Sequence, residues 1–521
     1  MPSLRRFAAL AILAALAGGA LAACARPTPH PAPAAAPARE LRFLLVNDVY
    51  VVDTLRDGSG GLARVAALRK RLAADGGGPV LFVLAGDVLS PSLLSKWYAG
   101  RQMVDAFDAA GLDYATLGNH ELELDRDTLL DRVRRSRFRW VSANCTNADG
   151  TPFAGVPAWD TVTVGGTRVG IFGLTLRGDY RRYARCADPD SAAHAAIAQL
   201  RMAGAAVVVG LTHQDLAADS ALLAREPALD LILGGHEHER HVVREGGRHV
   251  LKADANSRSA QLARLTRRAG GAGWEQSAHI YEIDRSLPFD SATAAVARGW
   301  RDSLLHRLGP ERSVGVAPVR LDARDATSRR GESPLGDLVT DGMREGTGAD
   351  VALINSGTLR LDDWLGPGPI SNYQLESIFL FADETRVVTF PLTGARLRAL
   401  LEHGVADGVY GHGGFLQLSG LRFRYDPSRP SGSRVVGDLV RDPGGRAIAP
   451  SDTVRVAFDV YPACTGGDGY EVPEAAPACA ARGSAPRTVD LLLAHITGPL
   501  AGRIVAPGAG RITRLGAPPA A

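Results

Sequence analysis

Short apolar runs alternate with amphipathic stretches through the first half of the chain. The amphipathic stretches have apolar residues at helical spacing and predict helices over 61–73, 101–110 and 190–203. The apolar runs are too short for buried helices and predict strands over 41–46, 80–84, 114–117, 166–174, 205–211 and 229–233. This alternation predicts an α/β fold.

A residue able to bind a metal follows each of five predicted strands. These residues are Asp48, Asp87, Asn119, His213 and the pair His236 and His238. Because ligands bind at the carboxyl ends of strands in α/β sheets, we expect these side chains to converge. Oxygen ligands mixed with imidazoles suit zinc, manganese, iron or a similar divalent ion, rather than calcium or copper(I).

The strand predicted at 114–117 leads through Gly118 into Asn119, His120 and Glu121. Desolvating such polar groups without partners costs several kcal/mol, so a bound ligand such as a metal would account for them. Taken alone, the same residues also fit an ordinary polar turn. The other four strand ends favour the ligand hypothesis.

The second half of the chain is expected to form a separate domain, because 521 residues exceed a single core. A helix at 292–308 has its apolar residues on one face and fits a connecting segment. A helix start and a strand follow at 332–339 and 351–354. We place the first domain at 40–285, the linker at 286–312 and the second domain at 313–515.

The N-terminus predicts export. Arg5 and Arg6 precede an apolar run over 7–21 that is too short to span a bilayer comfortably. The run ends in Leu-Ala-Ala-Cys24, which resembles a bacterial lipoprotein signal with a lipidated cysteine; a plain secretory signal is the alternative. We expect a signal at 1–23 and a Pro/Ala-rich tether at 24–39, so that Cys24 anchors a periplasmic or cell-surface protein to a bacterial membrane.

Cysteine usage agrees with export. Beyond Cys24 the chain has an even number of cysteines, two in each half, which predicts the disulfides Cys145–Cys186 and Cys464–Cys479. No Cys-x-x-Cys spacing supports a thiolate metal site.

Composition narrows the class of protein. Hydrophobic residues at 45% and charged residues at 22% are typical of a globular protein. The formal net charge of +3 is spread along the chain, which argues against a nucleic-acid partner. Only Lys70, Lys96 and Lys252 are lysines, so arginine supplies nearly all the positive charge. No pattern indicates an oligomeric state.

The ordered motifs resemble the calcineurin-like metallophosphoesterases, and specifically the exported two-domain 5′-nucleotidases. The family blocks Asp-x-His, Gly-Asp, Gly-Asn-His-Glu, a lone His and Gly-His-x-His match Asp48-Val49-Tyr50, Gly86-Asp87, Gly118–Glu121, His213 and Gly235–His238. The resemblance implies a four-layer α/β/β/α metallophosphatase domain followed by an α/β substrate-binding domain.

The same resemblance implies two divalent metal ions. Asp87 would bridge them, Asp48 and His238 would complete one site, and Asn119, His213 and His236 would complete the other. His120 would be catalytic rather than a ligand, lying over the phosphate to stabilise transition-state charge or to protonate the leaving group.

Two residues depart from the family pattern. Tyr50 stands where the family usually has histidine. It would bind either as a phenolate, which favours ferric iron, or not at all, which leaves that metal with more water, and we favour the second interpretation. Glu123 stands where secreted nucleotidases usually carry aspartate. It could orient His120 with a longer reach, or be a solvated helix-start residue.

The resemblance extends to a substrate site in the second domain. The stretch Asn355–Arg360 resembles the signature Asn-Gly-Gly-x-Ile-Arg, and glycine-rich backbone beside an arginine suits an anion. Two aromatic residues would sandwich a nucleobase, since stacking tolerates different bases. The implied substrate residues are Asn355, Gly357, Arg360, Phe381, Tyr461 and Asp468, with Arg329 as a helper.

The resemblance implies hydrolysis of nucleoside 5′-monophosphates or related nucleotides, in nucleotide catabolism. One alternative keeps the fold and changes the substrate to 2′,3′-cyclic nucleotides, UDP-sugars or a thiosulfate ester. Another is a nucleotide-binding lipoprotein with weak catalysis.

Overall fold

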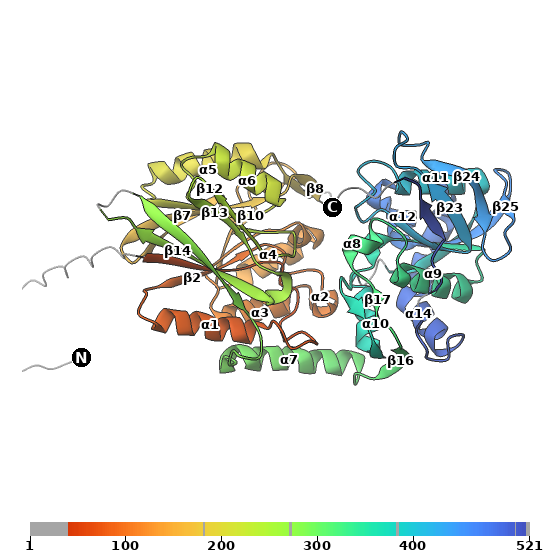
Figure 1. The fold of residues 1–521 in the computed structure, drawn as a ribbon, viewed down its shortest axis with the longest axis horizontal. Coiled ribbons are helices and arrows are strands. Elements are labelled where there is room, and N and C mark those ends of the chain that lie inside the picture. The colour runs from red at the N-terminus through yellow and green to blue at the C-terminus, as the bar shows by residue number, and fades with distance from the viewer. Residues whose placement is uncertain (1–39, 181–182, 270–272, 382–384, 506, 517–521) are drawn as a thin grey trace, which may run out of the picture.

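The computed structural model describes residues 40–516 apart from 181–182, 270–272, 382–384 and 506. The predicted signal, Cys24 and the tether lie outside the described residues. Within this described part, no helix combines the length and apolarity needed to cross a membrane. Two folded units lie side by side, and helix α7 (Ser291–Leu308) runs along the edge of the first toward the second (Figure 1).

The first unit contains two six-stranded sheets, ordered β15-β14-β1-β2-β3-β4 and β12-β13-β11-β10-β7-β6. The strands of the first sheet are β1 (Glu40–Val46), β2 (Val80–Ala85), β3 (Tyr114–Thr116), β4 (Arg139–Val141), β14 (Ser259–Arg267) and β15 (Trp274–Glu282). Those of the second are β6 (Trp159–Val164), β7 (Thr167–Thr175), β10 (Val207–His213), β11 (Leu231–Gly235), β12 (His241–Glu245) and β13 (Arg248–Lys252).

Side-chain alternation places β1 between two cores. Leu41, Phe43 and Leu45 pack between the sheets, whereas Leu44 and Val46 pack beneath helices on the outer face. The helices outside the first sheet are α1 (Leu62–Ala74), α3 (Arg101–Ala110), α4 (Arg126–Arg135) and α7, and those outside the second are α5 (Pro189–Met202) and α6 (Leu216–Arg225). The predicted four-layer α/β/β/α architecture is confirmed.

The parallel strands bring the expected ligands to one end of the domain. Strands β1, β2 and β3 run parallel, as do β10 and β11, so the carboxyl ends within each set share an edge. These strands lie within about two residues of the ranges expected from the sequence. The five polar strand ends therefore come from both sheets rather than from one.

The second unit is built around two four-stranded sheets, ordered β21-β26-β18-β22 and β25-β24-β23-β27. Their strands are β18 (Val351–Asn355), β21 (Val387–Thr393), β22 (Leu416–Ser419), β23 (Leu421–Tyr425), β24 (Val435–Arg441), β25 (Ala447–Ile448), β26 (Thr453–Asp459) and β27 (Ile512–Arg514). Two small sheets pair β16 (Ser313–Ala317) with β20 (Gly368–Ser371) and β17 (Leu321–Asp322) with β19 (Trp364–Leu365). The helices are α8 (Asp325–Ser328), α9 (Pro334–Thr347), α10 (Asn372–Ile378), α11 (Gly394–Gly404), α12 (Val460–Thr465), α13 (Ala476–Ala480) and α14 (Thr488–Thr497).

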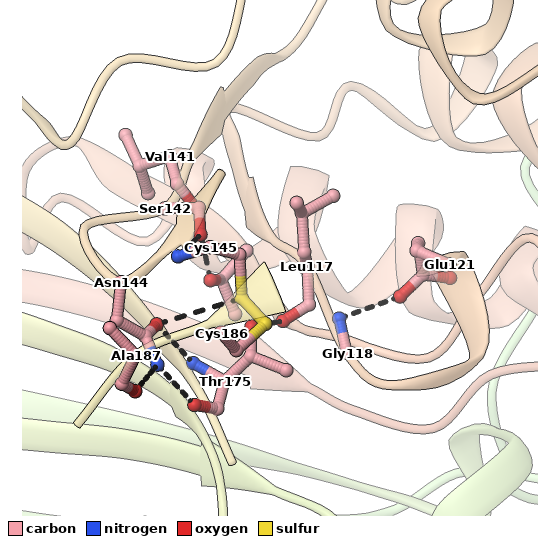
Figure 2. The surroundings of a disulfide bond; sticks show 11 residues. Leu117, Gly118, Glu121, Val141, Ser142, Asn144, Cys145, Thr175, Cys186 and Ala187 are labelled. Atoms are coloured by element: carbon pink, nitrogen blue, oxygen red, sulfur yellow. Dashed lines mark hydrogen bonds between the residues drawn. A yellow bond between two sulfur atoms is a disulfide. The ribbon is translucent and has the colours of Figure 1, made fainter. Parts of the chain in front are cut away.

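Both disulfides named from the sequence are formed, Cys145–Cys186 and Cys464–Cys479. The first joins directly opposite residues of strands β5 (Cys145–Asn147) and β9 (Ala184–Cys186), and β9 also pairs with β8 (Gly178–Tyr180). Figure 2 shows this disulfide beside Leu117 and Thr175, where the Thr175 hydroxyl donates to the Leu117 carbonyl at 2.6 Å. The disulfide therefore lies close to the segment that leads into Gly118.

A buried lysine joins the two units. Lys96, on helix α2 (Leu93–Tyr98), is 1% exposed and donates to Glu376 Oε2 at 2.7 Å and to the Phe379 carbonyl at 2.8 Å. At the start of the linker helix, the exposed Lys70 pairs with Asp290, which caps α7. Three ammonium–oxygen contacts therefore connect the first unit to the linker helix and the second unit.

Candidate active site

Asp48, Asp87 and His213 form a buried cluster where the two sheets meet. One ligand atom from each lies within 4.8 Å of the others, and all three side chains are buried. The preceding glycine makes the approach possible: a Cβ on Gly86 would lie 2.6 Å from His213 Nδ1, and the φ of Gly86 is +76°. The sequence Gly-Asp is therefore required by packing as well as by chemistry.

The donor atoms of this cluster fit a divalent metal ion. Asp48 Oδ1, Asn119 Oδ1 and His213 Nε2 are buried and make no hydrogen bond of acceptable geometry. His213 Nδ1 lies 2.9 Å from the Ala85 carbonyl and can donate to it, which leaves Nε2, 3.1 Å from Asp87 Oδ2, as the ring nitrogen available to a cation. Buried oxygen and nitrogen atoms that lack hydrogen-bond donors can be satisfied by a bound cation.

Electrostatics in the cluster favour ionised carboxylates. Burial raises the pKa of Asp87, but the neighbouring His213 and His120 outweigh it and hold this pKa well below its usual range. Burial alone would lower the pKa of His213, whereas Asp87 and Asp48 raise it to about 10. A bound cation would take the place of the His213 proton, because a histidine ligand binds through a deprotonated nitrogen.

The other expected ligands lie around this cluster. The His236 backbone N–H donates to Asp48 Oδ2 at 2.9 Å, and the ring centroids of His236 and His213 are 5.2 Å apart. His238 Nε2 lies 3.5 Å from Asp48 Oδ1. The structure thus brings His236 and His238 to the buried cluster, as the strand-end pattern predicts.

Tyr50 lies against the same groups. Its hydroxyl is 3.1 Å from Asp87 Oδ2 and 3.2 Å from His238 Nε2. Burial and the nearby carboxylates of Asp87 and Asp48 raise the pKa of Tyr50 well above its usual value, so the neutral phenol is the favoured form beside them.

Glu121 joins two of the ligand loops and is not itself in the cavity. Its buried carboxylate accepts from the backbone N–H groups of Asp87, Val88, Leu89 and Gly118 at 2.7–2.8 Å. Four charge-assisted hydrogen bonds hold the loop after β2 against the loop after β3. The third polar residue of the stretch Asn119-His120-Glu121 therefore has a structural role, because it holds the two loops together.

His120 lies between two charged residues. Its Nδ1 is 2.8 Å from Glu123 Oε1, and its Nε2 is 2.9 Å from Arg360 Nη2 of the second unit. The His120 backbone N–H donates to Asp87 Oδ1 at 3.0 Å, which holds this residue beside the buried cluster of candidate metal ligands. The structure therefore brings His120, Glu123 and Arg360 together across the boundary between the units.

A cavity of about 1780 Å³ lies between the two units and holds these groups. It is lined by all seven expected substrate residues, namely Arg329, Asn355, Gly357, Arg360, Phe381, Tyr461 and Asp468. Asn355 Nδ2 donates to Asp468 Oδ2 at 2.8 Å, and the guanidinium carbon of Arg360 is 5.9 Å from the Phe381 ring centre. Arg329 is instead paired with Asp325, so its charge is already matched.

Lys252 is a buried residue of the site that sequence reasoning missed. Its ammonium donates to the carbonyls of Gln214 and Gly235 at 2.6 and 2.8 Å and contacts the carboxylates of Asp219 and Glu237. Gln214 follows His213, and Gly235 precedes His236, so one side chain ties two ligand loops together. The available signal was the rarity of lysine in this arginine-rich chain.

The family models decide the classification. Residues 41–240 match the family model of the calcineurin-like phosphoesterases, and residues 313–475 match the family model of the 5′-nucleotidase C-terminal domain. The chain belongs to the two-domain 5′-nucleotidase family. Members of this family are metal-dependent phosphoester hydrolases, and the chain is assigned to that class of enzyme.

Individual relatives agree with the family assignment. Protein 5NUC of Lutzomyia longipalpis is 25% identical over 464 residues, covering 79% of this chain and 80% of that protein. A 5′-nucleotidase precursor from Thermus thermophilus is 27% identical with a TM-score of 0.77, covering 92% of this chain and all of that one. The sulfate thiohydrolase SoxB from Thermus thermophilus, 19% identical with a TM-score of 0.70 over 92% of this chain and 97% of that one, shares the fold.

Proposed function

We propose that this 5′-nucleotidase family member is an exported phosphohydrolase with two divalent metal ions that releases phosphate from nucleoside 5′-monophosphates or related nucleotides. The observation that carries the proposal is the shared cavity between the two units. It is lined by the expected metal ligands Asp87, Asn119, His236 and His238, by the His120–Arg360 pair and by the aromatic residues Phe381 and Tyr461. One substrate could therefore be bound through both its phosphate group and its base in this cavity.

The residues that would hold the metal ions are Asp48, Asp87, Asn119, His213, His236 and His238. The unsatisfied acceptor atoms of Asp48, Asn119 and His213 support this assignment. Two divalent ions, when bound, supply Lewis-acid charge and a nucleophile at neutral pH.

His120 and Arg360 would act on the phosphate itself. Arg360 offers a guanidinium fork for the phosphate oxygens, and its contact with His120 Nε2 places both side chains on one side of the reacting group. His120 would stabilise developing charge or pass a proton from Nε2 to the leaving oxygen. Glu123, 2.8 Å from Nδ1, would hold the ring in the required orientation.

Phe381 and Tyr461 would stack on the base, and Asp468 would contact the ribose. Asn355 holds the Asp468 carboxylate in place, and the φ of Asp468 is 54°, a left-handed conformation that costs energy for a non-glycine residue. Stacking on each base is worth roughly 1–3 kcal/mol and depends little on base identity. We therefore expect several nucleotides to be substrates.

The test is product analysis on a substrate panel, combined with metal analysis. The products are phosphate from AMP and other nucleoside monophosphates, nucleoside monophosphates from 2′,3′-cyclic nucleotides, UMP and a sugar phosphate from UDP-sugars, and sulfate from thiosulfate esters. The expected result is two metal ions per chain and release of phosphate from AMP. Activity on cyclic nucleotides or UDP-sugars but not on AMP would replace the substrate assignment. Less than one metal ion per chain with no phosphate release would refute the enzyme proposal and favour the nucleotide-binding lipoprotein.

Export and anchoring are part of the proposal and have a separate test. The pattern at 1–24 supports lipidation of Cys24. Expression of the full chain with a radiolabelled fatty acid should label the wild type, whereas Cys24→Ser should remain unlabelled. Labelling of both chains alike would refute the anchor at Cys24.

A further inference from the structure

The chain contains a carboxylate that no sequence motif indicated and that contacts the candidate metal centre from the second unit. Asp362 Oδ2 lies 3.2 Å from His238 Nδ1, and the two residues belong to different units. Asp362 follows Arg360 by two positions, so a single short segment contacts both His120 and His238.

The backbone at Asp362 has the same unusual geometry as the expected site residues. In the part of the chain that the structure describes, ten non-glycine residues have positive φ, and five of them are expected site residues: Asp48, Asp87, His236, His238 and Asp468. Asp362 is another, with a φ of 42°. Such conformations cost about 1–3 kcal/mol each and persist where the surrounding structure imposes them, often at functional sites.

Both carboxylate oxygens of Asp362 are committed to one arrangement. Oδ1 accepts the backbone N–H of Asp325 at 2.9 Å, which leaves Oδ2 to face His238. Accepting the Nδ1–H of His238 selects the tautomer whose Nε2 lone pair points toward Asp48 Oδ1 and the Tyr50 hydroxyl. The side chains are 32% and 37% exposed, so the contact orients the ring rather than adding much electrostatic free energy.

The comparison with His213 supports this interpretation. His213 also has its Nδ1 fixed by an acceptor and its Nε2 facing the cluster, but the acceptor is the Ala85 carbonyl of the same unit. His238 obtains the equivalent acceptor from the second unit. The acceptor for Nδ1 of His213 therefore lies within the first unit, whereas the acceptor for Nδ1 of His238 lies across the boundary.

We propose that Asp362 is a positioning residue that orients His238 for metal binding, so that the second unit contributes to the metal affinity of the first. The inference rests on the proposed metal centre. Its prediction is that one of the two metal sites weakens when the Asp362–His238 hydrogen bond is altered. Loss of such an outer partner typically weakens metal binding by roughly 10- to 100-fold.

The critical variant is Asp362→Asn. If the Asn oxygen keeps the Asp325 N–H, its amide group must face His238 Nδ1, which favours the opposite tautomer and places a proton on Nε2. Asp363→Asn is the matched control, because Asp363 is adjacent, is 58% exposed and comes no closer than 3.9 Å to its ion-pair partner Arg258. Metal-stripped full-length proteins would be titrated with Mn²⁺ by calorimetry, and the Co²⁺-loaded forms compared by visible absorption.

The expected result is a roughly 10- to 100-fold weaker affinity at one site for Asp362→Asn, with changed Co²⁺ bands, and wild-type values for Asp363→Asn. In a His238→Ala background, adding Asp362→Asn should change the affinity no further, which a merely structural role would not produce. Wild-type affinity and spectrum in Asp362→Asn would overturn this inference alone. A wild-type protein that binds no divalent ion would overturn the proposed function together with it.

Discussion

The Nη2 atom of Arg360 lies 2.9 Å from Nε2 of His120, across the boundary between the two units. The candidate phosphate site is therefore formed by side chains from both units. Replacing Arg360 by glutamine should lower kcat/KM for AMP by roughly 10- to 100-fold, since a charged hydrogen bond contributes about 1.5–3 kcal/mol. Steady-state kinetics checks this, with Arg320→Gln as control because Arg320 stacks on Trp364 away from His120. Equal losses in both variants would contradict a specific role for Arg360.

His120 and Glu123 are expected to act as a unit. His120→Ala should reduce kcat by about 10²- to 10⁴-fold, the usual contribution of a positioned acid–base group, with a smaller change in KM. Glu123→Gln should cost less, and the double variant should be no slower than His120→Ala. The exposed His279 on β15 provides a control histidine. Fully additive losses would show that Glu123 does not act through His120.

Lys252 should be much more important to stability than its single charge suggests. Lys252→Met leaves the buried Asp219 carboxylate and two carbonyls without their cationic partner, which typically costs about 3–5 kcal/mol. The 61%-exposed Lys70 is the control, and Lys70→Met should cost no more than about 1 kcal/mol. Urea unfolding measures both. Similar free energies of unfolding for the two variants would refute the proposed role of Lys252 in joining the ligand loops.

Asp337 is expected to make stability depend on pH. This residue of α9 is 2% exposed; burial and the neighbouring Glu332 raise its pKa to about 8, against the opposing effect of Arg511. Because the folded pKa is above the unfolded value of 3.8, the contribution is fully present below pH 3.8 and is lost as the pH rises toward 8. The free energy of unfolding should therefore fall across this range, and Asp337→Asn should flatten the curve. An identical slope in the variant would contradict this assignment.

The disulfide Cys145–Cys186 is expected to stabilise the chain more than Cys464–Cys479 does. Its cysteines are 41 positions apart in the sequence, whereas those of the second disulfide are 15 positions apart. The loss of chain entropy in the unfolded state gives stabilisations of roughly 4 and 3 kcal/mol, respectively. Thermal unfolding of the two Cys→Ser pairs should show the larger decrease in Tm for Cys145→Ser/Cys186→Ser. The opposite ranking would show that local packing near Thr175 and Leu117 outweighs chain entropy.

The sequence predicted the strands that carry the site because buried parallel strands are apolar runs with abrupt ends. Strand β2, for example, is buried throughout and stops at Ala85, immediately before Gly86 and Asp87. Strand β15 was not predicted, because Gln276 interrupts the apolar alternation of its partly buried positions. Edge strands of this kind depend on their neighbours rather than on their own pattern.

The residues that sequence reasoning missed are those whose partners are distant in the chain. Glu121 was recognised as a polar group, but its partners Asp87, Val88 and Leu89 lie more than 30 positions away. Asp362 contacts His238 over a separation of 124 positions. Motifs report the residues that touch a ligand, whereas supporting residues are defined only by the fold.

The rarity of lysine in this chain has a practical consequence. Of the three lysine side chains, Lys252 and Lys96 are 0% and 1% exposed, whereas Lys70 is 61% exposed. An amine-reactive fluorophore should therefore modify one side chain of the native protein. That side chain contacts Asp290 at the start of α7, so a dye attached to it would lie where the linker helix leaves the first unit and would report on the movement of this helix.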